Sequence, residues 1–87
     1  MKEKLRETLA ANAHETWTRW TDHFLRQCHE NDDGSLTIPA DAVSRWRRQM
    51  ATPYEKLTVR EQASDQAEAD LILGILETHS RILEDNG

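Results

Sequence analysis

The side chains best suited to metal binding or nucleophilic chemistry are four histidines and one cysteine: His14, His23, His29, His79 and Cys28. A structural zinc site needs Cys-x-x-Cys or closely spaced histidine pairs, and the sequence has neither. Cys28 and His29 are adjacent, so their side chains diverge on a helix, and no acid is placed beside them. We therefore expect no metal, no cofactor and no catalytic residue, and we predict that the protein is not an enzyme.

Residues 29–40 superficially match a calcium-binding loop, with Asn31, Asp33 and Gly34 at the expected places. The match fails at both ends. His29 occupies the first ligand place, and Ala40 occupies the twelfth, where a bidentate Glu belongs. We therefore interpret this segment as a turn that stops a helix.

The strongest binding signal is the segment 45–48, Arg-Trp-Arg-Arg, because arginines beside an aromatic ring can hold a phosphate or stack a base. One basic patch on an acidic chain favours a nucleotide-like anion over a nucleic-acid duplex. The alternative is structural, with Trp46 in the core and the arginines solvated or paired with Asp65, Glu68 and Asp70. The candidate residues for contact with a ligand or partner are Trp17, Trp20, Arg45, Trp46, Arg48, Tyr54, Asp65 and Glu68.

The net charge of −5 comes entirely from the C-terminal part of the chain. Residues 1–52 carry eight acids and eight bases, whereas residues 53–87 carry eight acids and three bases. This distribution argues against duplex nucleic acid as a partner. It is compatible with docking on a basic protein surface or with a solvated helix face. The acidic face expected to meet a partner consists of Glu77, Glu84 and Asp85.

The single Cys28 cannot form an internal disulfide, which favours a reducing compartment. No apolar run reaches the roughly 18–20 residues of a membrane span, and the start lacks the apolar core of a signal peptide. We therefore expect a cytoplasmic protein without membrane contact. Its 87 residues predict one domain, residues 1–87, which is marginally stable as a monomer unless it gains a partner or forms a homodimer.

Helical periodicity predicts an all-α fold, a small three-helix domain with two long helices packed antiparallel and a shorter middle helix. The helices are expected at about residues 2–30, 39–51 and 58–85, with a short extended segment at 35–38. Residues 1–12 are expected either to fray or to contact a partner. The stripes expected to face inward are Leu5, Leu9, Ala13, Trp17, Trp20, Phe24 and Cys28, then Val43, Trp46 and Met50, then Ala69, Ile72, Ile75, Leu76, His79 and Leu83.

The segment 53–70 ends the second helix and opens the third. Thr58 and Glu61 have the spacing of a capping box, in which each side chain satisfies a backbone donor at the helix start. The helical period places Asp65 close to the centre of the inward stripe. A carboxylate there needs donors, such as an indole N–H, a tyrosine hydroxyl or an arginine. Asp65 is then either a structural contact that fixes helix register or a ligand-contacting acid in a cleft between helices.

The segment 53–66, P-Y-E-K-L-T-V-R-E-Q-A-S-D-Q, resembles the end of the ryanodine-receptor repeat domain, or RyR domain. That family's pattern reads P-Y-x-x-L-x-x-x-E-K-x-x-D-R, and Glu61 and Asp65 match its acids. Gln62 and Gln66 stand where the pattern has Lys and Arg. The resemblance implies a compact helical module without catalytic activity.

Residues 14–76 also resemble short uncharacterised proteins of phages and prophages. Together the two resemblances imply an interaction module that binds a bacterial protein in the host cytoplasm, with inhibition of host defence as its role. A RyR-like sensor that binds a nucleotide-type ligand in a cleft between helices is the second hypothesis. A structural homo-oligomer, which would cover surplus apolar surface, is the third.

Overall fold

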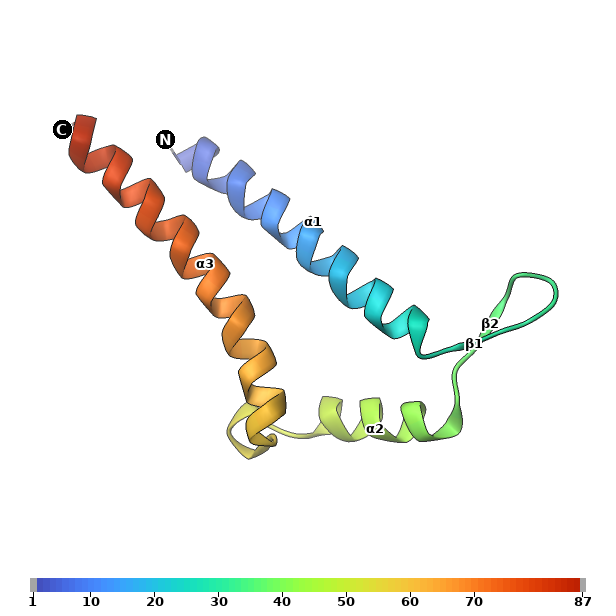
Figure 1. The fold of residues 1–87 in the computed structure, drawn as a ribbon. Helices are drawn as coiled ribbons and strands as arrows, with labels where there is room; N and C mark the ends of the chain where they lie inside the picture. Colours follow the sequence, from blue (N-terminus) through green and yellow to red (C-terminus); the bar gives the residue numbers. More distant parts are fainter. Residues whose placement is uncertain (1, 87) are drawn as a thin grey trace.

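The computed structural model describes the backbone of residues 2–86 and the side chains of residues 2–81. Three α-helices dominate it, which confirms the all-α prediction (Figure 1). Along the chain the elements are α1 (Lys2–Arg26), β1 (His29–Glu30), β2 (Leu36–Thr37), α2 (Ala40–Ala51), the 3₁₀ turn η1 (Tyr54–Lys56) and α3 (Val59–Asn86).

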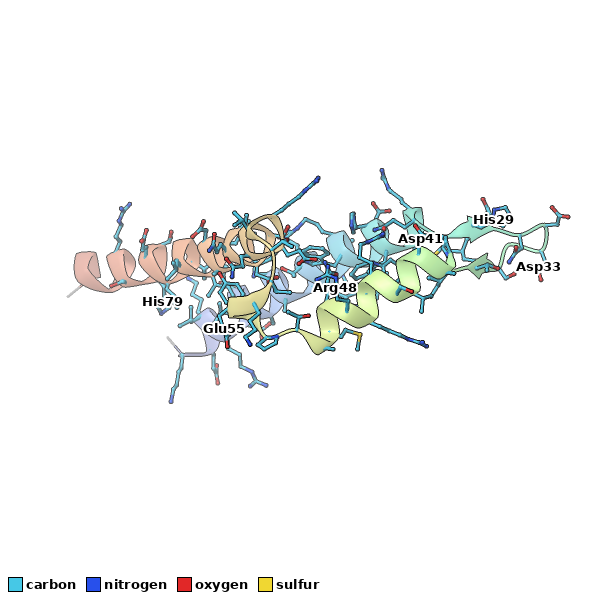
Figure 2. All side chains as sticks on the ribbon, turned by 90° about the horizontal axis from the view of Figure 1, so that it is seen from below. His29, Asp33, Asp41, Arg48, Glu55 and His79 are labelled. Carbon is cyan, nitrogen blue, oxygen red and sulfur yellow. The ribbon has the colours of Figure 1, made fainter. Side chains whose placement is uncertain are left out.

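The helices lie in a single layer. Figure 1 shows α1 and α3 running antiparallel, with both chain ends at the same end of the pair and α2 across the other end. The molecule measures 57 × 35 × 16 Å, and Figure 2 shows it edge-on, with the thin dimension vertical. A helix with its side chains is about 10–12 Å across. The thin dimension therefore leaves no room for a second layer.

The first helix ends at Arg26, so its predicted extension to Glu30 is wrong. His29 and Glu30 instead pair antiparallel with Thr37 and Leu36 in a small hairpin that projects from the helices (Figure 1). The extended segment predicted at 35–38 contains β2, the second strand of this hairpin.

Polar side chains close the hairpin turn. Asp33 Oδ1 accepts hydrogen bonds from the Ser35 amide at 2.9 Å and the Ser35 hydroxyl at 2.5 Å. These donors lower the pKa of the Asp33 carboxyl, with the Ser35 hydroxyl as the main cause. Gly34 has φ of 86°, a left-handed conformation that favours glycine. The carboxylate that a calcium loop would need is thus committed to its own turn.

The junction between α2 and α3 follows the sequence signals closely. Thr52 is extended before Pro53, and α2 ends there. The Glu61 amide donates to Thr58 Oγ1 at 3.2 Å, and the Thr58 amide donates to Glu61 Oε1 at 3.1 Å. This reciprocal pair confirms the predicted capping box at the start of α3.

Among the described side chains, no large one is fully buried. Ala42, 2% exposed, is the one buried residue among the described side chains. Trp17 is 63% exposed and Met50 is 87% exposed, so the prediction that both face inward is wrong. Helical periodicity identified the apolar side of each helix correctly, but a single layer covers only the edge that faces a neighbouring helix.

Candidate functional site

A polar cluster joins α1 to α3 near their middle. Arg19 Nη2 donates to both carboxylate oxygens of Glu68, at 2.7 and 2.9 Å, and Thr16 Oγ1 donates to Glu68 Oε2 at 3.0 Å. The pKa of the Glu68 carboxyl is lowered, mainly by the hydrogen bond from Arg19. Glu68, a candidate ligand residue, is therefore occupied by contacts that fix how the two helices pair.

A second cluster joins α2 to the start of α3. Arg48 Nη2 and Gln49 Nε2 each donate to Glu61 Oε2 at 2.5 Å. Hydrogen bonding from Arg48, then from Gln49 and the Thr58 amide, lowers the pKa of Glu61 to about 2. Arg48 was expected to be solvated or to pair with Asp65, Glu68 or Asp70, and its partner is Glu61 instead.

Four candidate residues line one hollow between the three helices, and this hollow is open to solvent. The hollow has a volume of about 910 Å³, and Trp20, Arg45, Trp46 and Asp65 are among its walls. The rings of Phe24 and Trp46 meet edge to face, with centroids 4.9 Å apart. This aromatic contact ties α1 to α2, and Arg45 adds a hydrogen bond to the Gln27 side-chain oxygen.

Asp65 lines this hollow but is exposed. No ion pair or side-chain hydrogen bond joins it to another described residue, so the expected donors are not supplied within this chain. Its position on the inward side is as predicted, and its expected burial is wrong. Figure 1 shows α1 and α3 diverging toward α2, and the hollow between the three helices is open there.

The remaining candidates lie apart from the hollow. The Tyr54 hydroxyl accepts a hydrogen bond from Gln66 Nε2 at 2.9 Å, which holds η1 against α3. Trp17 is exposed on α1, where its ring stacks on His14 with centroids 6.1 Å apart. On the acidic face Glu77 is exposed, whereas the side chains of Glu84 and Asp85 lie outside the described residues.

Within the described side chains, no three His, Cys, Asp or Glu residues gather as a metal site requires. No helix within residues 2–86 combines the length and the apolar character needed to cross a membrane.

The α1–α3 pair exposes an apolar face that no other part of the described chain covers. Its α3 part holds Leu73, 54% exposed, and Leu76, 41% exposed. Its α1 part centres on Trp17. We define this apolar face by six residues without charge or hydrogen-bonding side chains other than the indole: Ala13, Trp17, Ala69, Ile72, Leu73 and Leu76.

Helix geometry places both halves of the apolar face on one side of the layer. The hydrogen bond between Thr16 and Glu68 shows that these two residues face each other. The next residue on each helix, Trp17 or Ala69, is turned by about 100°. Because α1 and α3 run antiparallel, these two rotations carry both side chains to the same side.

The opposite side of the pair has a different character. Thr8 is nine residues before Trp17, half a turn away, and Gly74 is about 200° from Leu76. These residues line a smaller groove of about 460 Å³ with Lys4 and Thr78, and with the apolar residues Leu5, Leu71 and Ile75. On this side α1 is largely polar, whereas α3 adds apolar surface to the groove.

The importance of this apolar face was missed in the sequence, although a signal was present. Residues 71–76 read Leu-Ile-Leu-Gly-Ile-Leu, so α3 is apolar around most of its circumference there. A helix that is apolar on all sides is normally buried on all sides. One neighbouring helix cannot provide that burial.

No family model matches this sequence, and no curated protein or solved structure shows a significant match to it. The resemblances to the RyR domain and to phage proteins therefore stay predictions.

Proposed function

We propose that this chain is a non-enzymatic protein-interaction module that binds another protein chain through its apolar face. One observation carries the proposal: the described side chains include a single buried residue, Ala42, while Trp17, Leu73 and Leu76 are exposed together. Contiguous apolar patches of this kind mark interaction sites in soluble proteins.

The energetics of folding support the same reading. Ordering a residue costs roughly 1–2 kcal/mol of backbone entropy, and burial of apolar surface is the main term that offsets it. Two large side chains of the apolar face, Trp17 and Leu73, gain less from folding alone because they stay more than half exposed. A partner that covers the apolar face supplies the missing burial.

The partner we propose from the sequence resemblances is a protein of the bacterial cytoplasm, met in the course of blocking host defence. The acidic residues of α3 support a basic surface on such a partner. Asp70 and Glu77 are exposed on the side of α3 turned away from α1, clear of the apolar face. These two carboxylates would attract a basic partner while staying in water, outside the centre of the interface.

Site-specific photo-crosslinking tests this proposal. A photoreactive phenylalanine analogue replaces Leu73 on the apolar face, and a matched control carries it at Glu15, which is exposed on the polar side of α1. Irradiation of bacterial cells expressing each variant should give protein adducts from position 73 and none from position 15. Absence of adducts from position 73, or equal adducts from both positions, would contradict the proposal.

The hollow supports a second candidate, a sensor for a nucleotide-like ligand. Trp20, Trp46 and Arg45 line one open space, and stacking rings beside an arginine suit a base with its phosphate. Thermal-shift measurements with mononucleotides and cyclic oligonucleotides test it, with Arg45→Ala as the variant expected to lose the shift. No stabilisation by any of these ligands would refute this candidate.

A further inference from the structure

The chain exposes far more surface than a compact protein of its mass. Its accessible surface is 7322 Å² at 10.1 kDa. A compact monomer of that mass exposes about 5,300 Å², which leaves an excess of about 2,000 Å². Its radius of gyration is 17.7 Å, where about 12 Å is typical for this length. Both values indicate that a second layer of helices, which would cover one side of this one, is not supplied by the chain itself.

The excess is of the size that an obligate dimer buries. Two chains together carry an excess of about 4,000 Å², and permanent homodimer interfaces cover about 2,000–5,000 Å² in total over both subunits. Domains normally consist of two packed layers around one core, and this chain supplies one layer, 16 Å thick. A second copy laid on the apolar face completes that architecture.

We infer that the occupant of the apolar face is a second copy of this chain, so that two α1–α3 pairs form a four-helix bundle about a two-fold axis. The inference rests on the proposed function, that another protein chain covers the apolar face, and it leaves Asp70 and Glu77 of α3 exposed for the bacterial protein. A two-fold interface presents the same surface twice and must therefore match itself. The apolar face does so because it carries no charge, and because Ala13 and Ala69 beside Trp17 and Leu76 leave space for the partner's larger side chains.

Charge at the edge of the face supports this symmetry. Arg6 is seven residues before Ala13, and Asp65 is seven residues before Ile72, so both share the side of the apolar face. With Thr16 opposite Glu68, they lie roughly 10 Å from the centre of the face in opposite directions along the helices. A two-fold axis that passes through that centre, between the two layers and across the helices, brings Arg6 of one copy to the same level along the bundle as Asp65 of the other.

Both charges are free to form an ion pair across the interface. Neither Arg6 nor Asp65 takes part in an ion pair with another described residue. The dimer therefore supplies the donor that Asp65 lacks within its own chain. Two such ion pairs, one at each end of the interface, would fix the antiparallel register of the bundle.

Sedimentation equilibrium of the full chain tests the dimer. The wild type should sediment at twice its mass of 10.1 kDa. Leu76→Lys, which places a charge in the apolar face, should raise the dissociation constant at least about a hundredfold. The matched control, Thr8→Lys on the polar side of α1, should leave it within about threefold. A monomeric wild type at roughly millimolar concentration, or equal weakening by both lysines, would overturn the inference.

A charge swap removes the objection that Leu76→Lys merely unfolds the chain. Arg6→Asp and Asp65→Arg should each weaken the dimer about threefold or more, because each sets like charges opposite one another. The double variant restores opposite charges and should recover wild-type association. A double variant weaker than both single variants would overturn the arrangement.

The two proposals fail in different ways. A monomeric chain that still forms adducts with other proteins from position 73 would refute the dimer and leave the interaction module standing. A monomeric chain without adducts of any mass would refute both.

Discussion

Trp17→Ala tests how much of the association depends on one side chain. Trp17 is 63% exposed in the single chain, so its removal leaves few contacts within that chain to lose. Alanine also has the higher helix propensity, and α1 should keep its helical structure. The substitution is therefore expected to act on association rather than on the helix.

The expected magnitude follows from the exposed area. A tryptophan side chain offers about 250 Å² at most, so the exposed 63% of Trp17 corresponds to about 150 Å². Covering all of that area contributes about 4 kcal/mol per copy at about 25 cal/mol per Å², and covering half contributes about 2 kcal/mol. Because a dimer contains two copies of Trp17, even half coverage raises the dissociation constant about a thousandfold.

Sedimentation velocity over a range of concentrations measures the dissociation constant. Met50→Ala is the matched control, because Met50 is a large apolar residue, 87% exposed, on α2 and outside the apolar face. The control should change the dissociation constant by less than about threefold. Equal effects of the two substitutions, or no effect of Trp17→Ala, would refute the assignment of the apolar face as the interface.

Three further predictions concern the helices themselves. Thr58→Ala removes one half of the capping box and should lower the free energy of unfolding by about 1 kcal/mol in urea titrations, whereas Thr58→Ser should keep the wild-type value. Gly74→Ala should raise the melting temperature, because a Cβ there meets no atom within 4 Å and alanine is favoured over glycine in a helix by about 1 kcal/mol; a decrease would mean that the groove is occupied. The pKa of Glu61 is about 2 when folded against an ordinary 4.5, so its contribution is fully present above about pH 4.5 and is lost as the pH falls toward 2. Acid titration of wild type and Glu61→Gln should show less loss of stability in that window for the variant, and parallel curves would contradict the assignment.

Much of the fold follows from local signals in the sequence. The all-α class, the Thr52–Pro53 stop and the Thr58–Glu61 capping box depend on residues near one another in the chain, and all three are present. The end of α1 was misplaced because Cys28 and His29 continue the helical pattern. The competing hairpin depends on Asp33, Gly34 and Ser35, whose effect on pairing cannot be seen from periodicity.

The arrangement of the helices could not be predicted in the same way. Periodicity identifies which side of a helix is apolar, but not how many neighbours cover it. For that reason Trp17 and Trp20 were assigned to one inward stripe, although Trp17 is exposed and Trp20 is partly buried. Polar contacts between helices, such as Arg19 with Glu68 and Arg48 with Glu61, depend on register that only the three-dimensional structure provides.

Part of the candidate site was likewise predicted from the sequence, and part was not. Trp20, Arg45, Trp46 and Asp65 were expected near one another and do line one hollow. The apolar face escaped the sequence analysis because all of its residues except Leu73 were interpreted as core. An apolar helix side is equally compatible with burial inside a chain and with burial between chains.

Thermal unfolding followed by circular dichroism, over protein concentrations from about 1 µM to 1 mM, tests most directly whether this chain completes its core only against a second copy. Dimerisation stabilises by mass action, about 1.4 kcal/mol for each tenfold increase in concentration. For a dimer of this size the melting temperature should rise by about 3–6 °C per tenfold increase. A single sharp transition at the same temperature across the whole range would contradict the account.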